Sequence, residues 1–368
     1  FDRMADHILD HYIFPFEYQR AIQGNLPYSH VLTAYKRYKV FLNVNSIQNS
    51  PSMFSRRVFE LMASGTNIIS GKARGLMSTF KNDFVTQCSS ESETKAALES
   101  LFSDKDKREK KAHKAMREVL SHHTYTHRLQ EVLQKVGIEF ENPLKRKQKV
   151  AVFVELKSAQ NLKQSLQNFQ SQTHSEKELH FICQTKKQFS KINKKLPEDK
   201  SVNLHFKDEG ESFFDAFFRI FSRLDSQFIS IFKESDFYGP RFLSDFLLTF
   251  LYTNASIVTK HSSYCFNAET GNLYHQNTSC EHEITHYLNE SCFLAKKNFF
   301  LEPLTREILS QEAATLSETT QKLQYEIYAS DRFNYLKICG NAIPSTSLNC
   351  LLIKSACSNS GAEEFIII

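Results

Sequence analysis

Short strand-like runs alternate with amphipathic helical patterns along most of this chain. In its first part, "YKVFLNVNS" (Tyr38–Ser46), "TNIIS" and "DFVTQCSS" have the composition of strands. A helical pattern spans about Ser52 to Ala63, and Gly65 follows where such a helix would end. Further helical patterns lie around Glu91–Phe102, Lys105–Ser121 and His127–Val136. This alternation predicts a parallel sheet covered by helices, which is an α/β layer structure.

The same order repeats after "ENPLKRKQK" (Glu141–Lys149), a charged segment that contains a proline. We interpret this segment as a linker because a new strand begins directly after it; the alternative is an ordinary surface loop. Strand patterns follow at Val150–Leu156, "ELHFICQ", "VNLHF" and Gln227–Phe232, and helical patterns at "NLKQSLQNFQSQ", Ser212–Leu224 and Arg241–Tyr252. The sequence therefore predicts two Rossmann-like, doubly wound α/β domains, residues 1–142 and 148–345, and an irregular tail over residues 346–368.

The bulk composition limits the class of protein and of partner. A length of 368 residues is typical of two domains, and 41% apolar residues can build real cores. The net charge of +5 is modest and comes largely from local lysine runs, so we expect no nucleic-acid partner. A basic surface can still favour an anionic ligand or membrane headgroups, which allows peripheral membrane contact.

Cysteine usage and hydropathy bear on the cellular compartment. The eight cysteines include no CxxC pair, and several lie in apolar runs such as "LHFICQ", which favours reduced thiols in a cytoplasmic protein. We expect no transmembrane segment and no signal peptide. The sequence begins at Phe1 and not at methionine, so we also expect a fragment of a longer protein.

A polar loop between Ser46 and Ser52 leaves a strand end and enters the first long helix. Ligands of open α/β sheets bind outside such strand ends, and free N–H groups at a helix start favour phosphate. Glu60 lies about two turns further along, off the apolar face, and its carboxylate can accept two hydrogen bonds from the hydroxyls of a ribose. The alternative is a surface ion pair with Arg56, worth roughly a few tenths of a kcal/mol.

Two acidic residues, Glu234 and Asp236, follow the buried strand Gln227–Phe232. If the chain stays extended there, both carboxylates point the same way and can share Mg²⁺ or Mn²⁺ with diphosphate oxygens. Such a metal would neutralise a departing nucleoside diphosphate. The alternative is a turn that places Asp236 near the next helix, with Pro240 in its first turn.

The pentapeptide "HEITH" (His282–His286) matches the H-E-x-x-H zinc signature. On a helix the two histidines would bind Zn²⁺ with Glu283 as base, and Glu302 is a candidate third ligand. We disfavour this interpretation because the flanking residues are more polar than those of a buried zinc-peptidase helix.

The segment from Tyr38 to Gly71, followed by "HHTYTHRLQEVL" (His122–Leu133), resembles the C-terminal half of GT-B glycosyltransferases. The likeness covers roughly residues 25–137 and is greatest to bacterial group-1-like enzymes of the spore-maturation type. It implies a nucleotide-sugar site at Ser50 and Ser52, with Glu60 on the ribose and Arg57 facing the phosphates. The N-terminal, acceptor-binding half of such enzymes is absent from the sequence.

The segment "QFISIFKESDFYGPRFLSDF" is similar to the metal-binding stretch of GT-A glycosyltransferases, and "EIYASDRFNYLKI" resembles the end of that domain. The resemblance implies Glu234 and Asp236 as metal ligands, although Lys233 and Ser235 stand where acids are expected. Inverting enzymes of this kind need a general base, and Glu312 is the nearest match. The alternative for Glu312 is an exposed helix residue.

These resemblances imply a bacterial glycosyltransferase of the hexosyltransferase type. It would move a sugar from a nucleotide-sugar donor to a glycan or cell-envelope acceptor. The alternative function is a catalytically inactive pair of domains that binds glycans or partner proteins, which the thinned acidic cluster favours.

Overall fold

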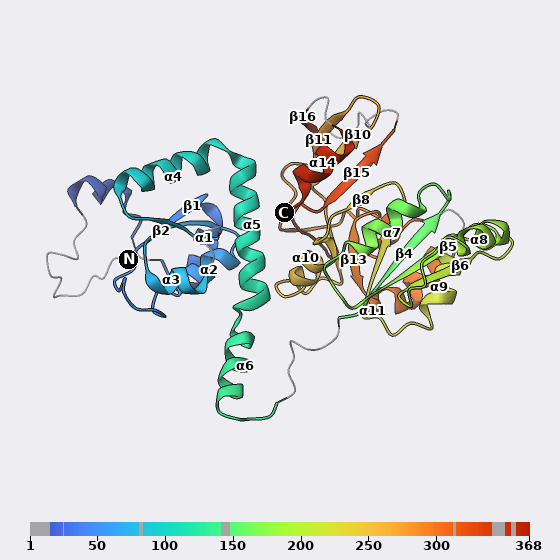
Figure 1. The fold of residues 1–368 in the computed structure, drawn as a ribbon, viewed down its shortest axis with the longest axis horizontal. Coiled ribbons are helices and arrows are strands. Elements are labelled where there is room, and N and C mark those ends of the chain that lie inside the picture. Colours follow the sequence, from blue (N-terminus) through green and yellow to red (C-terminus); the bar gives the residue numbers. More distant parts are fainter. Residues whose placement is uncertain are drawn as a thin grey trace. The chain divides into compact units, whose positions relative to one another are not determined.

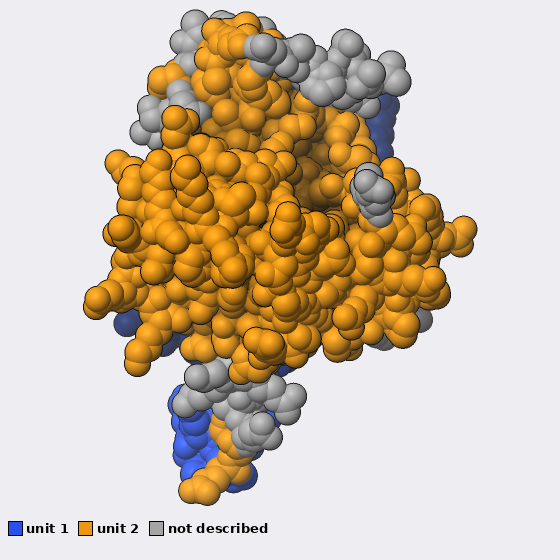
Figure 2. Space-filling model, turned by 90° about the vertical axis from the view of Figure 1, so that its right-hand side faces the viewer, with its two compact units in different colours: residues 1–138 blue, residues 139–368 orange. Residues whose placement is uncertain are grey.

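The computed structural model describes residues 15–24, 26–80, 84–140, 148–311, 314–340, 350–354 and 358–368. It divides into two compact units, Phe1–Ile138 and Glu139–Ile368 (Figure 2). Most of the predicted linker, residues 141–147, lies outside the described residues. No helix in the described ranges is both long enough and apolar enough to span a membrane. The assignment of the predicted domains, residues 1–142 and 148–345, to GT-B and GT-A types stays a prediction.

Unit 1 is built on a three-stranded parallel sheet in the order β1-β2-β3 (Figure 1). Its strands are β1 (Val40–Asn43), β2 (Asn67–Gly71) and β3 (Thr86–Cys88). Its helices are η2 (Phe16–Ala21), α1 (Tyr28–Arg37), α2 (Arg57–Ala63), α3 (Arg74–Thr79), α4 (Glu91–Ser103), α5 (Lys105–His122) and α6 (Tyr125–Lys135). The core joins α2, β2, α3 and α5 through buried apolar side chains, among them Val58, Leu61, Ile68, Leu76 and Val119.

Helix α2 shows which local signals decided its ends. Its predicted end is confirmed: Gly65 has φ +68°, its N–H donates to Met62 O at 3.0 Å, and Thr66 N–H donates to Leu61 O at 3.0 Å. This pair of bonds is a Schellman motif. The predicted start at Ser52 was wrong, because Ser50 Oγ accepts the Met53 N–H at 3.1 Å and the chain stays a loop until residue 56.

Unit 2 contains a mixed eight-stranded sheet in the order β12-β14-β9-β13-β7-β4-β5-β6. These strands are β4 (Val150–Leu156), β5 (Lys177–Cys183), β6 (Val202–Phe206), β7 (Phe228–Phe232), β9 (Ile257–Thr259), β12 (Glu283–Thr285), β13 (Phe293–Lys296) and β14 (Ile327–Ala329). The four strands β7, β4, β5 and β6 are parallel, whereas β13 runs antiparallel between β7 and β9.

A second, five-stranded sheet of unit 2 has the order β16-β11-β10-β15-β8 (Figure 1). Its strands are β8 (Phe237–Tyr238), β10 (Ser263–Asn267), β11 (Asn272–Gln276), β15 (Tyr335–Cys339) and β16 (Cys350–Lys354). The helices of unit 2 are α7 (Leu162–Gln170), α8 (Lys186–Asn193), α9 (Phe213–Phe221), α10 (Phe242–Thr249), α11 (Lys297–Leu301), α12 (Pro303–Leu309), α13 (Leu316–Lys322) and α14 (Asn359–Ile366).

Strand β4 is buried on both faces, as its nearly continuous apolar sequence predicts. Val150, Val152 and Val154 pack in one core with side chains of α7 and α10. Ala151 and Phe153 pack in another core with the phenylalanines of α9 and α11. Helices therefore cover both faces of the sheet, and the predicted α/β class is confirmed.

The predicted irregular tail was wrong for part of residues 346–368. Strand β16 pairs antiparallel with β11, and helix α14 buries Ala362 and Ile366 against Tyr264, Phe333 and Leu336. The described apolar side chains of α14 pack in one cluster with residues of β10, β11 and β15, so the order of this part of the tail depends on tertiary contacts that a segment-by-segment interpretation does not contain.

A partly buried pair of histidines makes the stability of unit 2 depend on pH. His205 Nε2 on β6 lies 3.2 Å from His180 Nδ1 on β5, and the rings stack with centroids 5.4 Å apart. Burial, followed by the nearby charges of His180 and Arg219, lowers the pKa of His205 to about 4. The folded state therefore resists a proton that the unfolded state binds below its ordinary pKa of about 6.5.

We expect the contribution of His205 to the free energy of unfolding to be fully present above about pH 6.5. This contribution should fall as the pH drops toward 4. The His205→Phe variant keeps an aromatic ring for stacking, so it should lose on the order of 2 kcal/mol of this pH dependence. Urea unfolding between pH 7 and 4.5 measures it. Equal slopes for the variant and the wild type would contradict the prediction.

The Glu178→Gln variant is the matched control, because it should affect stability in a different pH range. Burial raises the pKa of Glu178, but contacts with His180, Ser226 and Lys149 outweigh it and lower the pKa to about 2. Stability from this carboxylate is present above its ordinary pKa of about 4.3 and is lost toward pH 2. The Glu178→Gln variant should therefore change the slope at lower pH than the His205→Phe variant does.

Candidate functional site

A cavity of about 360 Å³ opens in unit 1 where β1 ends. It is lined by the residues that follow β1 and by the approach to α2: Val44, Asn45, Ser46, Ile47, Met53, Phe54, Ser55 and Arg57. Ligands of parallel α/β sheets bind at this end of the strands. The cavity therefore lies where the sequence predicts a ligand.

Buried side-chain amides hold the wall of this cavity in place. Asn45 Nδ2 donates to Ser70 Oγ at 3.0 Å and to Gly71 O at 3.2 Å, and Asn43 Nδ2 donates to the same Ser70 oxygen at 3.0 Å. Asn45 Oδ1 accepts the Ser55 N–H at 3.4 Å, across the loop. Sequence reasoning missed Asn45 and Ser55; the signal was the pair of asparagines in "NVNS" at the strand end.

A second cavity of about 270 Å³ in unit 1 shares one residue, Arg57, with the first. Its lining is mostly apolar: Gly24, Leu26, Val31, Ala34, Tyr35, Phe41 and Arg57. The Arg57 side chain thus lines both an apolar cavity and a cavity of mixed lining, in which polar groups such as Asn45 lie beside apolar side chains such as Phe54. A ligand with a charged part and a flat apolar part suits this pair of cavities.

Glu60 is mostly buried, with 18% of its side chain exposed, and does not turn into bulk water. Its Oε1 lies 2.9 Å from Arg56 Nε and accepts from Tyr28 at 3.3 Å, and its Oε2 accepts from the Tyr35 hydroxyl at 3.4 Å. Burial and the Glu60 charge raise the pKa of Tyr35. The ion pair with Arg56 is present, and the ribose role of Glu60 stays a prediction.

The two predicted serines differ in their surroundings. Ser50 Oγ accepts N–H groups from Ser52 at 3.4 Å and Met53 at 3.1 Å, so it shapes the loop. Ser52 is exposed. Neither serine is among the residues that line the two cavities, whereas Arg57 lines both.

In unit 2, Asp236 is completely buried. Its carboxylate accepts hydrogen bonds from the Tyr335 hydroxyl at 2.7 Å, the Ser235 hydroxyl at 3.1 Å and the Ile338 N–H at 3.3 Å. Burial raises its pKa, and the bond from Tyr335 only partly offsets this. Asp236 therefore ties β8 to β15 from the inside.

Glu234 points to different neighbours, because its Oε2 accepts the N–H groups of Lys157 at 3.1 Å and Ser158 at 3.3 Å. The expectation of an extended chain was wrong: Asp236 N–H donates to Lys233 O at 3.1 Å, and the segment turns. The two carboxylates do not converge, so their arrangement does not fit one shared Mg²⁺ or Mn²⁺.

A larger cavity of about 550 Å³ lies at the ends of β4 and β7, and Figure 2 shows that the visible face of unit 2 is hollowed. Its lining combines Glu155, Lys157 and Glu290 with side chains of α9 and with Leu309, Gln311, Ala314, Thr315 and Leu316. The predicted base Glu312 lies outside the described residues, between the lining residues Gln311 and Ala314.

The zinc-peptidase geometry of "HEITH" is absent. Glu283–Thr285 forms strand β12, which pairs antiparallel with β14, and His282 has φ +57°. Glu302, the candidate third ligand, accepts a hydrogen bond from the Tyr325 hydroxyl. A motif that requires two histidines on one helix face cannot form on an edge strand.

The sequence around the first two cavities is similar to a known family. Residues 9–134 match the family model described as glycosyl transferase-like. The matched region includes every residue that lines these two cavities. No curated protein matches the chain.

Two solved structures show weak similarity. Mannosyltransferase PcManGT from Pyrobaculum calidifontis, in complex with GDP-Man and Mn²⁺, is 11% identical with a TM-score of 0.40, over 55% of this chain and 59% of that chain. S. aureus TarS 1–349 is 10% identical with a TM-score of 0.39, over 52% of this chain and 60% of that chain. The chain thus spans about three fifths of each of these structures.

Close packing on Gly75 of α3 fixes the loop that forms the first cavity. A Cβ at Gly75 would lie 3.0 Å from Met53 O and 3.1 Å from Phe54 Cδ1. Glycine to alanine in a helix is normally stabilising. We expect Gly75→Ala to destabilise unit 1 by about 1–3 kcal/mol, because the backbone of the loop must move.

Thermal unfolding of the Gly75→Ala variant measures this effect. Gly71→Ala is the control, because a Cβ at Gly71 meets nothing within 4 Å. If Gly75→Ala is as stable as Gly71→Ala, the loop does not pack on α3 as described.

Proposed function

We propose that this chain is a glycosyltransferase of the hexosyltransferase type that binds its nucleotide-sugar donor in unit 1. The sugar would pass to a glycan or cell-envelope acceptor. The observation that carries the proposal is Arg57, which lines both the cavity of mixed lining where β1 ends and the apolar cavity. The match of residues 9–134 to the glycosyl transferase-like model supports it.

The two cavities suggest how a donor would lie. The apolar cavity, with Tyr35 and Phe41 in its lining, suits a nucleobase. The cavity of mixed lining, beside Asn45 and Ser55, suits the sugar and diphosphate. The guanidinium of Arg57 would pair with the diphosphate and stabilise the charge that grows on it as the sugar leaves.

Glu60 is placed to take the ribose hydroxyls. The hydrogen bonds that it accepts from Tyr28 and Tyr35 are long, at 3.3 and 3.4 Å, and ribose hydroxyls could replace them. Ser50 and Ser52 would act from the loop, Ser50 by fixing its shape. We also propose that the protein is bacterial and cytoplasmic, with at most peripheral contact to a membrane.

A specific observation favours the second candidate function for unit 2. Its two acidic side chains do not converge, and Lys233 and Ser235 stand where further acids would be expected. Unit 2 would then bind a glycan or partner protein without catalysing transfer.

Donor binding to the full chain tests the proposal, with UDP-, GDP- and CDP-sugars as probes. We expect Arg57→Ala to weaken binding by about 10- to 100-fold, since a hydrogen bond to a charged group is worth about 1.5–3 kcal/mol. Glu60→Gln should weaken it as well. Calorimetric titration with and without Mn²⁺ gives the affinities, and donor hydrolysis reports turnover.

Arg74→Ala is the matched control, because Arg74 is exposed and lines neither cavity. It removes the same charge from the same unit and should leave affinity within about twofold, well below the change expected from a lost charged hydrogen bond. Equal loss in both variants, or no binding of any nucleotide sugar by the wild type, would refute a donor site at Arg57. Glycan binding without nucleotide affinity would support the second candidate function.

A further inference from the structure

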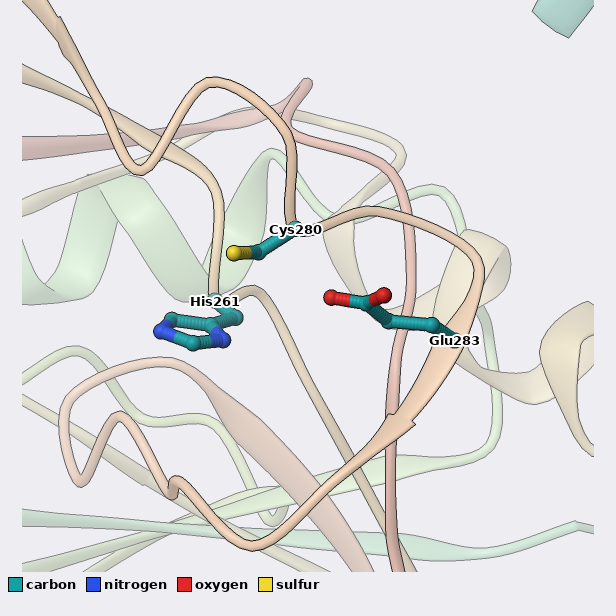
Figure 3. Close-up of side chains that lie close together, drawn as sticks. All are labelled: His261, Cys280 and Glu283. Atoms are coloured by element: carbon teal, nitrogen blue, oxygen red, sulfur yellow. The ribbon is translucent and has the colours of Figure 1, made fainter. Parts of the chain in front are cut away.

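Three side chains of unit 2 with metal-binding chemistry meet at a place that the proposed function does not use. His261 follows β9, in the connection to β10, Cys280 lies on the segment that joins β11 to β12, and Glu283 is the first residue of β12. One potential ligand atom from each residue lies within 4.8 Å of the other two. Figure 3 shows the carboxylate of Glu283 extending toward the other two side chains.

Hydrogen bonds of Asn277 hold the two segments close together. Asn277 Nδ2 donates to His261 O at 3.1 Å, and Asn277 O accepts the Cys280 N–H at 3.1 Å. Asn277 and His282 have φ values of +53° and +57°, which are uncommon for residues with a side chain. The turn between these two residues therefore places Cys280 beside His261 in a defined geometry.

His261 is oriented but incompletely satisfied. Its ring stacks on Tyr287 with centroids 4.4 Å apart, and its Nδ1 is buried with no hydrogen-bond partner among the described residues. A buried polar atom without a partner is rare and costs free energy. Burial lowers the pKa of His261, which favours the neutral ring with its free lone pair.

A nucleophilic cysteine is the main alternative, and the electrostatics oppose it. Burial, with the charge of Glu283 and a hydrogen bond to it, raises the pKa of the Cys280 thiol. Reactive cysteines need the opposite shift, because the thiolate is the nucleophile. A carboxylate beside a thiol is instead a favourable pair of ligands for a divalent cation, which compensates both negative charges.

We propose that His261, Cys280 and Glu283 bind Zn²⁺, with water as the fourth ligand. A thiolate, an imidazole and a carboxylate together suit Zn²⁺, whereas Mg²⁺ and Ca²⁺ prefer oxygen ligands alone. Bond lengths of about 2.0–2.3 Å place ligand atoms of a tetrahedral site roughly 3.5 Å apart. The three groups would therefore close in by about 1 Å, which exposed Glu283 can supply by rotation.

The position of the site suggests its role. Strands β9 and β12 belong to the eight-stranded sheet, and β10 and β11 belong to the five-stranded sheet. Of the connections that join these sheets, one passes through His261 and another through Cys280. The zinc would bind to both of them. It would thus be a structural clamp within unit 2, and binding should raise the stability of the folded state.

Metal titration of the full chain tests the proposal. After treatment with a chelator and its removal, ZnCl₂ is titrated by calorimetry, and Co²⁺ is added as a spectroscopic probe. We expect one zinc per chain, a higher melting temperature with zinc, and a thiolate-to-cobalt charge-transfer band. Cys280→Ser should abolish the band, and Glu283→Gln and His261→Gln should each weaken zinc binding at least tenfold.

His286→Gln is the matched control, because His286 belongs to the same "HEITH" segment, is exposed, and contacts Tyr325 O at 3.4 Å instead of the cluster. Its zinc affinity should equal that of the wild type. Glu283→Gln changes an exposed side chain, so it tests the site even if the other two variants fold poorly. Absence of zinc binding, a cobalt band that persists in Cys280→Ser, or equal losses in His286→Gln would overturn the proposal.

Discussion

Buried polar groups need hydrogen-bond partners, and this requirement determines the geometry of the sites described above. In unit 1 it joins Asn45 to Ser70 and Gly71, and so holds open the cavity where β1 ends. In unit 2 it draws Asp236 inward, toward the Tyr335 hydroxyl and away from solvent. At His261 the same need is unmet, since Nδ1 has no partner in the described structure. The satisfied groups stabilise the scaffold, and the unpartnered nitrogen of His261, one of several such buried atoms in the described structure, belongs to the proposed zinc site.

Much of the fold followed from local patterns. The strands Val150–Leu156 and Val202–Phe206 have the predicted bounds, because a nearly continuous apolar run in the first and an alternation of apolar and polar residues in the second are typical of strands. The stop at Gly65 was equally local, since only glycine adopts its backbone conformation easily. The tail at residues 350–354 and 359–366 could not be predicted in this way, because its order depends on strands far away in the sequence.

The candidate sites were predicted less well, and the reasons are physical. Arg57 lines a cavity where β1 ends, and its predicted contact with phosphates stays a prediction. Glu234 and Asp236 were expected to share an ion, but one turn in the backbone separates their carboxylates. Glu283 was singled out within a helical motif, yet its neighbour in space, His261, comes from another loop. Spacing in the sequence specifies a site only when the secondary structure is already known.

Strand β12 also bears on how the largest sheet of the protein ends. It contains only three residues, it begins with the exposed Glu283, and it presents the half-exposed Ile284 to solvent. A long, flat and uncharged edge would invite another chain to pair with it and seed aggregates. A short edge with a charge at its start offers few free backbone groups for such pairing. The brevity of this strand thus protects the protein from self-association during synthesis and folding.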